Sequence, residues 1–156
     1  YARDQNIAML TPKRIWEMAT KDGAVVVGLE DHLGRIEEGY RADIAVFGRV
    51  GPDPYEALIA SNTDDVRLVL IDGKGFYGDA NLQQVTGLNE FCEPFDACGE
   101  QKFICVQEST SAADGKNERY DDIRTQLYNI LEGIGYPEDE QYGRGDELLE
   151  LALCDK

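Results

Sequence analysis

The chain has 156 residues, 31 of them acidic and 15 basic, and its formal net charge at pH 7 is −16. This charge makes binding to nucleic acid or to an anionic membrane surface electrostatically unfavourable, so neither is expected as a partner. A hydrophobic content of 42% is enough for a packed core, whereas a complete (β/α)8 barrel needs about 250 residues and is excluded. No apolar run reaches the length of a membrane-spanning segment. The first residues lack the pattern of a signal peptide, which carries no information if the chain is a fragment.

The first predicted element is a helix that begins at Pro12. The Thr11 hydroxyl can accept from a free amide of the first turn, and proline is favoured at the first helical position. Apolar residues then recur at helical spacing: Ile15, Trp16, Met18 and Ala19. They predict one face buried against a large neighbour, with Trp16 interpreted as a core residue rather than a ligand-stacking one.

A second short helix is expected directly after the first. Thr20 can cap it, Asp22 suits its positive end, and Gly28 can close it in a left-handed conformation. The β-branched run Val25–Val27 favours a strand when taken alone. A helix at this run therefore requires tertiary packing that overrides the local preference.

Two strands are predicted next. Residues 34–39 have the pattern of a short strand that ends in a turn, and residues 42–47 that of a strand buried on both faces. Asp43 at the start of the second strand is a candidate catalytic residue, but we interpret it as a partner for backbone amides. Between this strand and the next, residues 55–60 form a helical turn, and Asp64-Asp65 belongs to a solvated loop rather than a metal site.

Residues 66–71 and 74–77 predict a β-hairpin. The intervening Asp72-Gly73 supplies positive φ at both central positions, which a type I′ turn requires.

Three stretches in this order resemble the carboxyl-terminal end of the amidohydrolase superfamily, the metal-dependent hydrolases that include cytosine deaminase, imidazolonepropionase and chlorohydrolase-type enzymes. The stretches are LTPKRIWEMATKDGA, VVVGLEDHLGRIEEGYRADIAVF and VRLVLIDGKGFYGD, within residues 10–79. Any one motif alone is weak, and the order and spacing carry the resemblance. The motif positions are Thr20, Ala24, Gly39, Ala42, Asp43, Asp72 and Gly73.

The resemblance implies an α+β segment: the last helix region of a TIM barrel, the C-terminal strands of an accessory β-sandwich, and then a cysteine-containing tail with two helices. Such enzymes cleave C–N bonds with a metal-activated water. Their ligands lie on barrel strands, outside this segment, and the single histidine, His32, is expected in a solvent-facing loop. No catalytic or metal-binding residue is therefore assigned here. A divalent metal, with zinc favoured, and the remainder of the barrel are expected in the parent protein.

The tail contains Cys92, Cys98, Cys105 and Cys154. Four cysteines allow three disulfide pairings, and the spacing does not match a zinc knuckle, so disulfides rank first, buried thiols second and zinc third. A bridge from Cys92 or Cys98 to Cys105 is geometrically reasonable, and a bridge from Cys154 to this cluster would pin the terminus. The even cysteine count favours a periplasmic or secreted location, with the cytoplasm as the alternative.

Beyond the cysteines, residues 109–117 are a small-residue linker and residues 120–131 an amphipathic helix that ends at Gly133 and Gly135. A polar loop, 136–145, then leads to a last helix near 146–153. The two helices are expected to pack on each other or on the sandwich, with partner binding as the alternative. The predicted regions are barrel helices 1–29, sandwich strands 30–80, a cysteine-rich extension 81–108, a linker 109–119 and a helical tail 120–156.

Two functions follow from these patterns. In the first, the chain is the C-terminal structural part of an amidohydrolase acting on non-peptide C–N bonds, and is inactive alone. In the second, it is a freestanding, acidic, disulfide-stapled binding or interaction module. The second leaves the apolar face around Trp16 uncovered, which argues against it. A homo-oligomer is an alternative partner alongside the remainder of the barrel.

Overall fold

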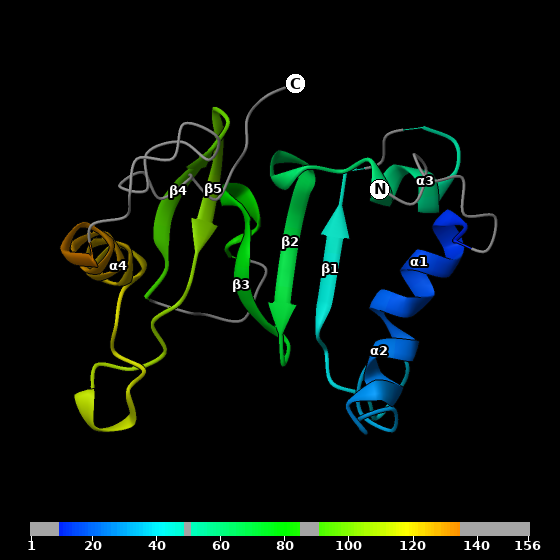
Figure 1. Cartoon of the computed structure of the whole chain (residues 1–156), viewed down its shortest axis with the longest axis horizontal. Coiled ribbons are helices and arrows are strands. Elements are labelled where there is room, and N and C mark those ends of the chain that lie inside the picture. The colour runs from blue at the N-terminus through cyan, green and yellow to red at the C-terminus, as the bar shows by residue number, and fades with distance from the viewer. Residues whose placement is uncertain (1–9, 49–50, 85–90, 135–156) are drawn as a thin grey trace.

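The computed structural model describes residues 10–48, 51–84 and 91–134, which form an α+β fold. The helices are α1 (Pro12–Ala19), α2 (Lys21–Val26), α3 (Pro54–Ile59) and α4 (Tyr120–Ile134), and the strands are β1 (Ile44–Phe47), β2 (Val66–Ile71), β3 (Lys74–Asp79), β4 (Glu93–Ala97) and β5 (Glu100–Ile104). All pairings are antiparallel, in the order β1-β2-β3-β5-β4. Figure 1 shows α1, α2 and α3 beyond β1 and α4 beyond β4.

Helix α1 begins at Pro12 as predicted, and the Thr11 hydroxyl accepts from the Arg14 amide at 3.2 Å. Its apolar face is only partly covered, because α1 contains no buried residue. The Trp16 ring packs against Tyr55 of α3, with ring centroids 5.4 Å apart. The large neighbour predicted for this face is therefore not among the described residues.

Helix α2 confirms the predicted helix as far as Val26, and Val27 follows as its C-cap residue. Thr20 precedes it but does not cap it, because its hydroxyl donates to the Trp16 carbonyl at 2.8 Å. The helix ends in a Schellman motif, in which Gly28 has φ 70° and the Leu29 amide donates to the Ala24 carbonyl at 2.9 Å. The three valines are nonetheless exposed, Val26 by 85%.

The predicted strand at residues 34–39 is wrong. These residues form bends and turns, and Ile36 is 86% exposed. The loop is closed by the Arg41 amide, which donates to the His32 carbonyl at 2.9 Å. An extended segment needs a neighbouring strand for its backbone groups, and the described residues offer none at this position.

Strand β1 lies at the edge of the sheet rather than buried on both faces, which corrects the prediction for residues 42–47. Within residues 10–48, 51–84 and 91–134 it pairs only with β2, and both Val46 and Phe47 are exposed. The continuous apolar run predicts burial on both faces, but no described element covers either face enough to bury it, and the pairing with β2 occupies only one edge. The β2–β3 hairpin is confirmed, with positive φ at Asp72 and Gly73.

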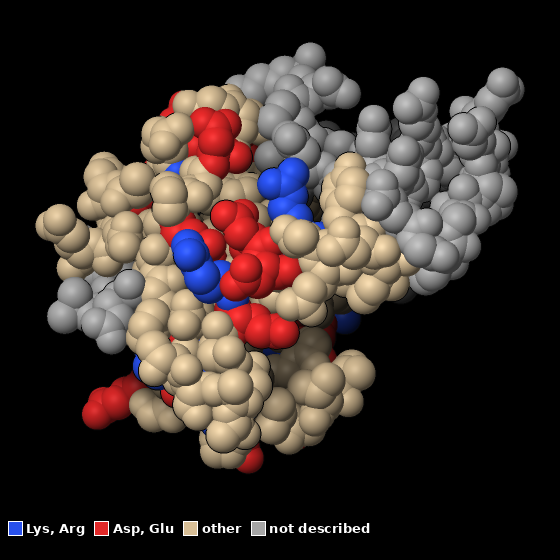
Figure 2. Space-filling model, turned by 90° about the vertical axis from the view of Figure 1, so that its left-hand side faces the viewer, with Lys and Arg blue, Asp and Glu red and all other residues tan. Residues whose placement is uncertain are grey.

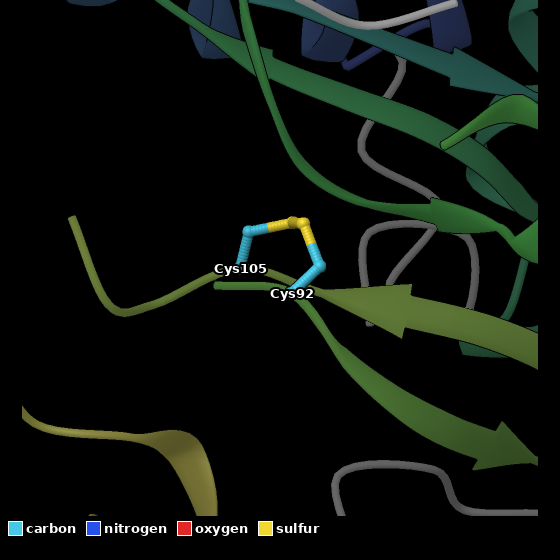
Figure 3. The surroundings of a disulfide bond; sticks show 2 residues. All are labelled: Cys92 and Cys105. Carbon is cyan, nitrogen blue, oxygen red and sulfur yellow. A yellow bond between two sulfur atoms is a disulfide. The ribbon is translucent and has the colours of Figure 1, made fainter. Parts of the chain in front are cut away.

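The cysteine-rich segment extends this sheet. Strand β5 pairs with β3, and a disulfide joins Cys92, before β4, to Cys105, after β5 (Figure 3). Cys98 is disulfide-bonded as well, whereas Cys154 lies outside the described residues. The apolar residues below a tenth exposed are mostly from this end of the sheet: Ala97, Phe103, Ile104 and Cys105, with Ala24 and Ala57 elsewhere.

Helix α4 confirms the predicted helix and runs on through Gly133, which was expected to end it. Its apolar residues Leu127 and Ile130 are exposed. Residues 109–117 form a loop that is closed at its base, where the Glu108 and Ser109 amides donate to the Lys116 carbonyl at 2.9 Å and 3.2 Å. Gly135, the loop 136–145 and the helix 146–153 lie outside the described residues. None of the described helices is long and apolar enough to cross a membrane.

Candidate functional site

The motif residues Ala42-Asp43 form hydrogen bonds with the motif residues Asp72-Gly73. The Asp43 carboxylate accepts from the Asp72 amide at 2.7 Å, and the Ala42 carbonyl accepts from the Gly73 amide at 3.0 Å. Both amides of the β2–β3 turn are therefore satisfied by the residues that lead into β1. Asp43 acts as an acceptor for backbone groups, as interpreted from the sequence, but the amide lies 29 positions away.

Replacing Asp43 by alanine should lower the free energy of unfolding by about 1–2 kcal/mol, because a hydrogen bond to a charged group is lost at an exposed position. Asp43→Asn keeps an acceptor oxygen and should lose less. Urea denaturation of both variants gives the comparison. Equal losses for alanine and asparagine would contradict the assigned hydrogen bond.

The other motif residues shape the backbone around α2. Ala24 is buried, and a side chain at Gly34 would lie 2.9 Å from the Lys21 Cα atom and 3.0 Å from the Ala24 Cβ atom. Gly34 and Gly39 also have positive φ, 87° and 89°. Gly34 lets the loop after α2 pass close to the helix, whereas a side chain at Gly39 would meet no atom within 4 Å, and neither position presents a reactive group.

A buried lysine on β5, next to the edge strand β4, is a residue that the sequence patterns did not predict. Lys102 of β5 has a side chain with 0% exposure, and its Nζ atom contacts Asp79 Oδ1 at 2.5 Å. It also donates to the carbonyls of Val66 at 2.9 Å and Asp64 at 3.2 Å. Arg67 lies 3.5 Å from the other Asp79 oxygen. The network joins β5 to β3 and to the start of β2.

A buried glutamate holds the start of α4. Glu93 is 4% exposed, and its Oε2 atom accepts from the Tyr120 amide at 2.7 Å. Arg119 Nη2 lies 3.0 Å from Oε1 as an ion pair, without the alignment of a hydrogen bond. A carboxylate at the positive end of a helix is electrostatically favourable. Glu93 therefore docks α4 onto β4.

An aromatic cluster lies beside this contact. The ring of Phe95 meets Tyr77 at 5.9 Å and Tyr120 at 5.6 Å between centroids, both edge-on. The Tyr77 hydroxyl is buried and has no hydrogen-bond partner among the described residues. Desolvation, with smaller contributions from the charges of Asp79 and Asp64, raises the pKa of Tyr77 above its ordinary value of 10.0.

The raised pKa of Tyr77 predicts a loss of stability at alkaline pH. The folded state holds the neutral phenol more strongly than the unfolded state does, so this contribution is complete below pH 10 and falls as the pH rises through the folded pKa. Tyr77→Phe should decline less steeply above pH 10 and should be as stable at pH 7, or more stable by up to about 1 kcal/mol, because no hydrogen bond is lost. Denaturation at both pH values measures this. Parallel pH profiles would contradict it.

The described residues do not fit a metal site. No three histidine, cysteine, aspartate or glutamate side chains converge in residues 10–48, 51–84 and 91–134. His32 is exposed in its loop, as expected, and the Asp65 carboxylate accepts from the Asn62 amide at 3.0 Å. Figure 2, from the side of α4, shows acidic side chains gathered with basic ones among them. This arrangement matches a solvated face.

Neither Lys102 nor Glu93 carries a local sequence signal. A lysine in a strand and a glutamate before a proline are ordinary surface patterns, and only the register of the sheet shows that Lys102 lies opposite Asp79. That register joins strands separated by the segment around residues 85–90. The contacts of Lys102 and Glu93 are therefore buried and structural.

Comparison with known proteins finds similarity over the first part of the chain. Residues 2–75 match the amidohydrolase family. The chain is 38% identical over 82 residues to a 5-methylthioadenosine/S-adenosylhomocysteine deaminase of Desulforamulus reducens, and 40% identical over 65 residues to the protein of that name from Syntrophomonas wolfei. It is also 46% identical over 43 residues to an S-triazine hydrolase of Gordonia rubripertincta.

These alignments cover 45%, 37% and 28% of the chain, but only 19%, 15% and 9% of the respective relatives. The chain thus spans about a fifth or less of the length of the curated relatives it matches.

Proposed function

We propose that this chain, whose residues 2–75 match the amidohydrolase family, is the C-terminal structural part of a metal-dependent hydrolase that acts on non-peptide C–N bonds. In this proposal α1 and α2 belong to the last helix region of a TIM barrel, and β1, β2 and β3 to the accessory sandwich. The names of the relatives, two deaminases and a triazine hydrolase, support C–N hydrolysis.

The observation that carries this proposal is the exposed apolar surface of α2 and the loop after it. Val25, Val26, Val27 and Ile36 are between 59% and 86% exposed. Helix formation by β-branched residues is locally disfavoured and is normally offset by burial. Because the described residues leave this run uncovered, the barrel of the parent enzyme is the natural neighbour. The exposed edge of β1 also supports the proposal, because its backbone groups could pair with a strand from the other part of the sandwich.

Amidohydrolases generally use a divalent metal, and the proposal for the parent is zinc. The described residues do not fit that site, so its ligands and the reacting groups would come from the remainder of the enzyme. The role of this segment would be to support the barrel through α1 and α2 and to complete the sandwich.

A substitution that is silent in the isolated chain but damaging in the whole enzyme would test this role. Val26→Asp should change the stability of the isolated chain by less than about 0.5 kcal/mol, because the side chain is exposed there. In the complete enzyme the same charge would be buried against the barrel and should lower the melting temperature by several degrees, since about 1 kcal/mol corresponds to about 2–4 °C in larger domains. Gln126→Asp on exposed α4 is the matched control.

The intact mass and metal content of the native protein complete the test. We expect a mass well above 17.4 kDa and bound divalent metal. A native mass of 17.4 kDa, with a monodisperse, soluble chain, would overturn the proposal and favour the freestanding interaction module.

A further inference from the structure

The turn between β4 and β5 places a cysteine in an unusual backbone conformation. Cys98 has φ 57° and Gly99 has φ 85°, and the flanking residues Ala97 and Glu100 pair across the two strands. A two-residue turn with positive φ at both positions favours asparagine, aspartate or glycine. Cysteine at the first position costs free energy. An interaction of its sulfur would offset that cost.

Cys98 is disulfide-bonded, and free cysteines are absent from the part of the chain that the structure describes. Cys92 and Cys105 are bonded to each other, so neither is available to Cys98. The sequence contains one further cysteine, Cys154. We propose that Cys98 and Cys154 of the same chain form a second disulfide.

The two bonds would hold the β4–β5 hairpin at opposite ends. Cys92 and Cys105 flank its open end, next to the paired Glu93 and Ile104, and Cys98 lies in its turn. The second bond would attach residue 154 to that turn. Helix α4 would then lie inside a closed covalent loop, in addition to its contact with Glu93.

The bond forms by thiol–disulfide exchange with a disulfide oxidant such as oxidised glutathione. The thiolate of one cysteine attacks the oxidant and releases one thiol, and the second cysteine then attacks the mixed disulfide and releases the other. Two protein thiols are oxidised to one disulfide while the oxidant is reduced to two thiols. Persistence of the bond requires an oxidising compartment, which matches the periplasmic or secreted location proposed from the cysteine count.

Peptide mapping of the unreduced chain tests the pairing. Free thiols are first blocked with iodoacetamide, and the protein is then digested with trypsin and endoproteinase Asp-N. Cleavage after Lys102 and Arg144 and before Asp96 puts each cysteine on a separate peptide. We expect peptide 96–102 linked to peptide 146–154, and peptide 79–95 linked to peptide 103–113. Two copies of peptide 96–102 linked together, or alkylated Cys98, would overturn the proposal.

Single variants provide the matched control. The parent chain should react with no equivalent of iodoacetamide, whereas Cys98→Ser and Cys154→Ser should each react with one, at Cys154 and Cys98 respectively. Both variants should keep the linked peptides 79–95 and 103–113, which confirms that the hairpin has folded. An unreactive Cys154 in Cys98→Ser would overturn the pairing.

Discussion

Lys102→Met should lower the free energy of unfolding by about 3–5 kcal/mol, because removing one partner of a buried ion pair leaves the other uncompensated. Lys102 has no exposed side-chain surface, and the loss would leave Asp79 and the carbonyls of Asp64 and Val66 without its ammonium group. The methionine keeps most of the side-chain volume. Urea denaturation followed by circular dichroism measures the effect.

Lys74→Met is the matched control for Lys102→Met. Lys74 lies on β3 in the same sheet and is exposed, so its replacement should change stability by less than about 0.5 kcal/mol. The double variant Lys102→Met with Asp79→Asn should lose less free energy of unfolding than the sum of the two single variants. Lys102→Met leaves the Asp79 carboxylate without its partner, and Asp79→Asn removes that charge. A loss below about 1 kcal/mol for Lys102→Met would contradict the buried network.

Removing the Cys92–Cys105 disulfide should cost about 3 kcal/mol. The bond closes a short loop, with a sequence separation of 13, and a closed loop of this size restricts the unfolded chain by about that amount. The double variant Cys92→Ala with Cys105→Ala avoids leaving a single thiol. Its denaturation midpoint should be compared with that of the parent without reductant, so that other disulfides stay intact. Coincident unfolding curves would show that the bond contributes no stability.

The local elements of the fold could be predicted where a few adjacent residues determine the backbone. Thr11-Pro12 begins α1, Gly28 ends α2 and Asp72-Gly73 forms the hairpin turn, each as expected. Each of these signals acts on the backbone of a few adjacent residues. The resulting local conformation therefore does not depend on distant parts of the protein.

The errors arose where a neighbour decides the conformation. Residues 34–39 and 42–47 have strand patterns, but the first segment has no adjacent strand among the described residues. The second pairs along one edge only and is mostly exposed. The same holds for the buried charges. Lys102 faces Asp79 through a pairing of β3 with β5 that no local pattern encodes.

The candidate site was predicted mainly as a set of motif positions, and the structure gives some of them a physical role. Ala42 and Asp43 bind the amides of Asp72 and Gly73, so two separate motifs depend on one contact. The predicted absence of catalytic residues in the segment stays a prediction.

The strand order β1-β2-β3-β5-β4 also bears on how the chain folds. Within each of the pairs β2–β3 and β4–β5, a two-residue turn connects the strands, so these hairpins require little loop closure and should form on the microsecond timescale. The β3–β5 pairing brings the two hairpins together across a longer segment and has to desolvate the Lys102 ammonium as it forms. We therefore expect the docking of the hairpins to be the slow step, with mutations at Lys102 changing the refolding rate only as far as this contact is present in the transition state.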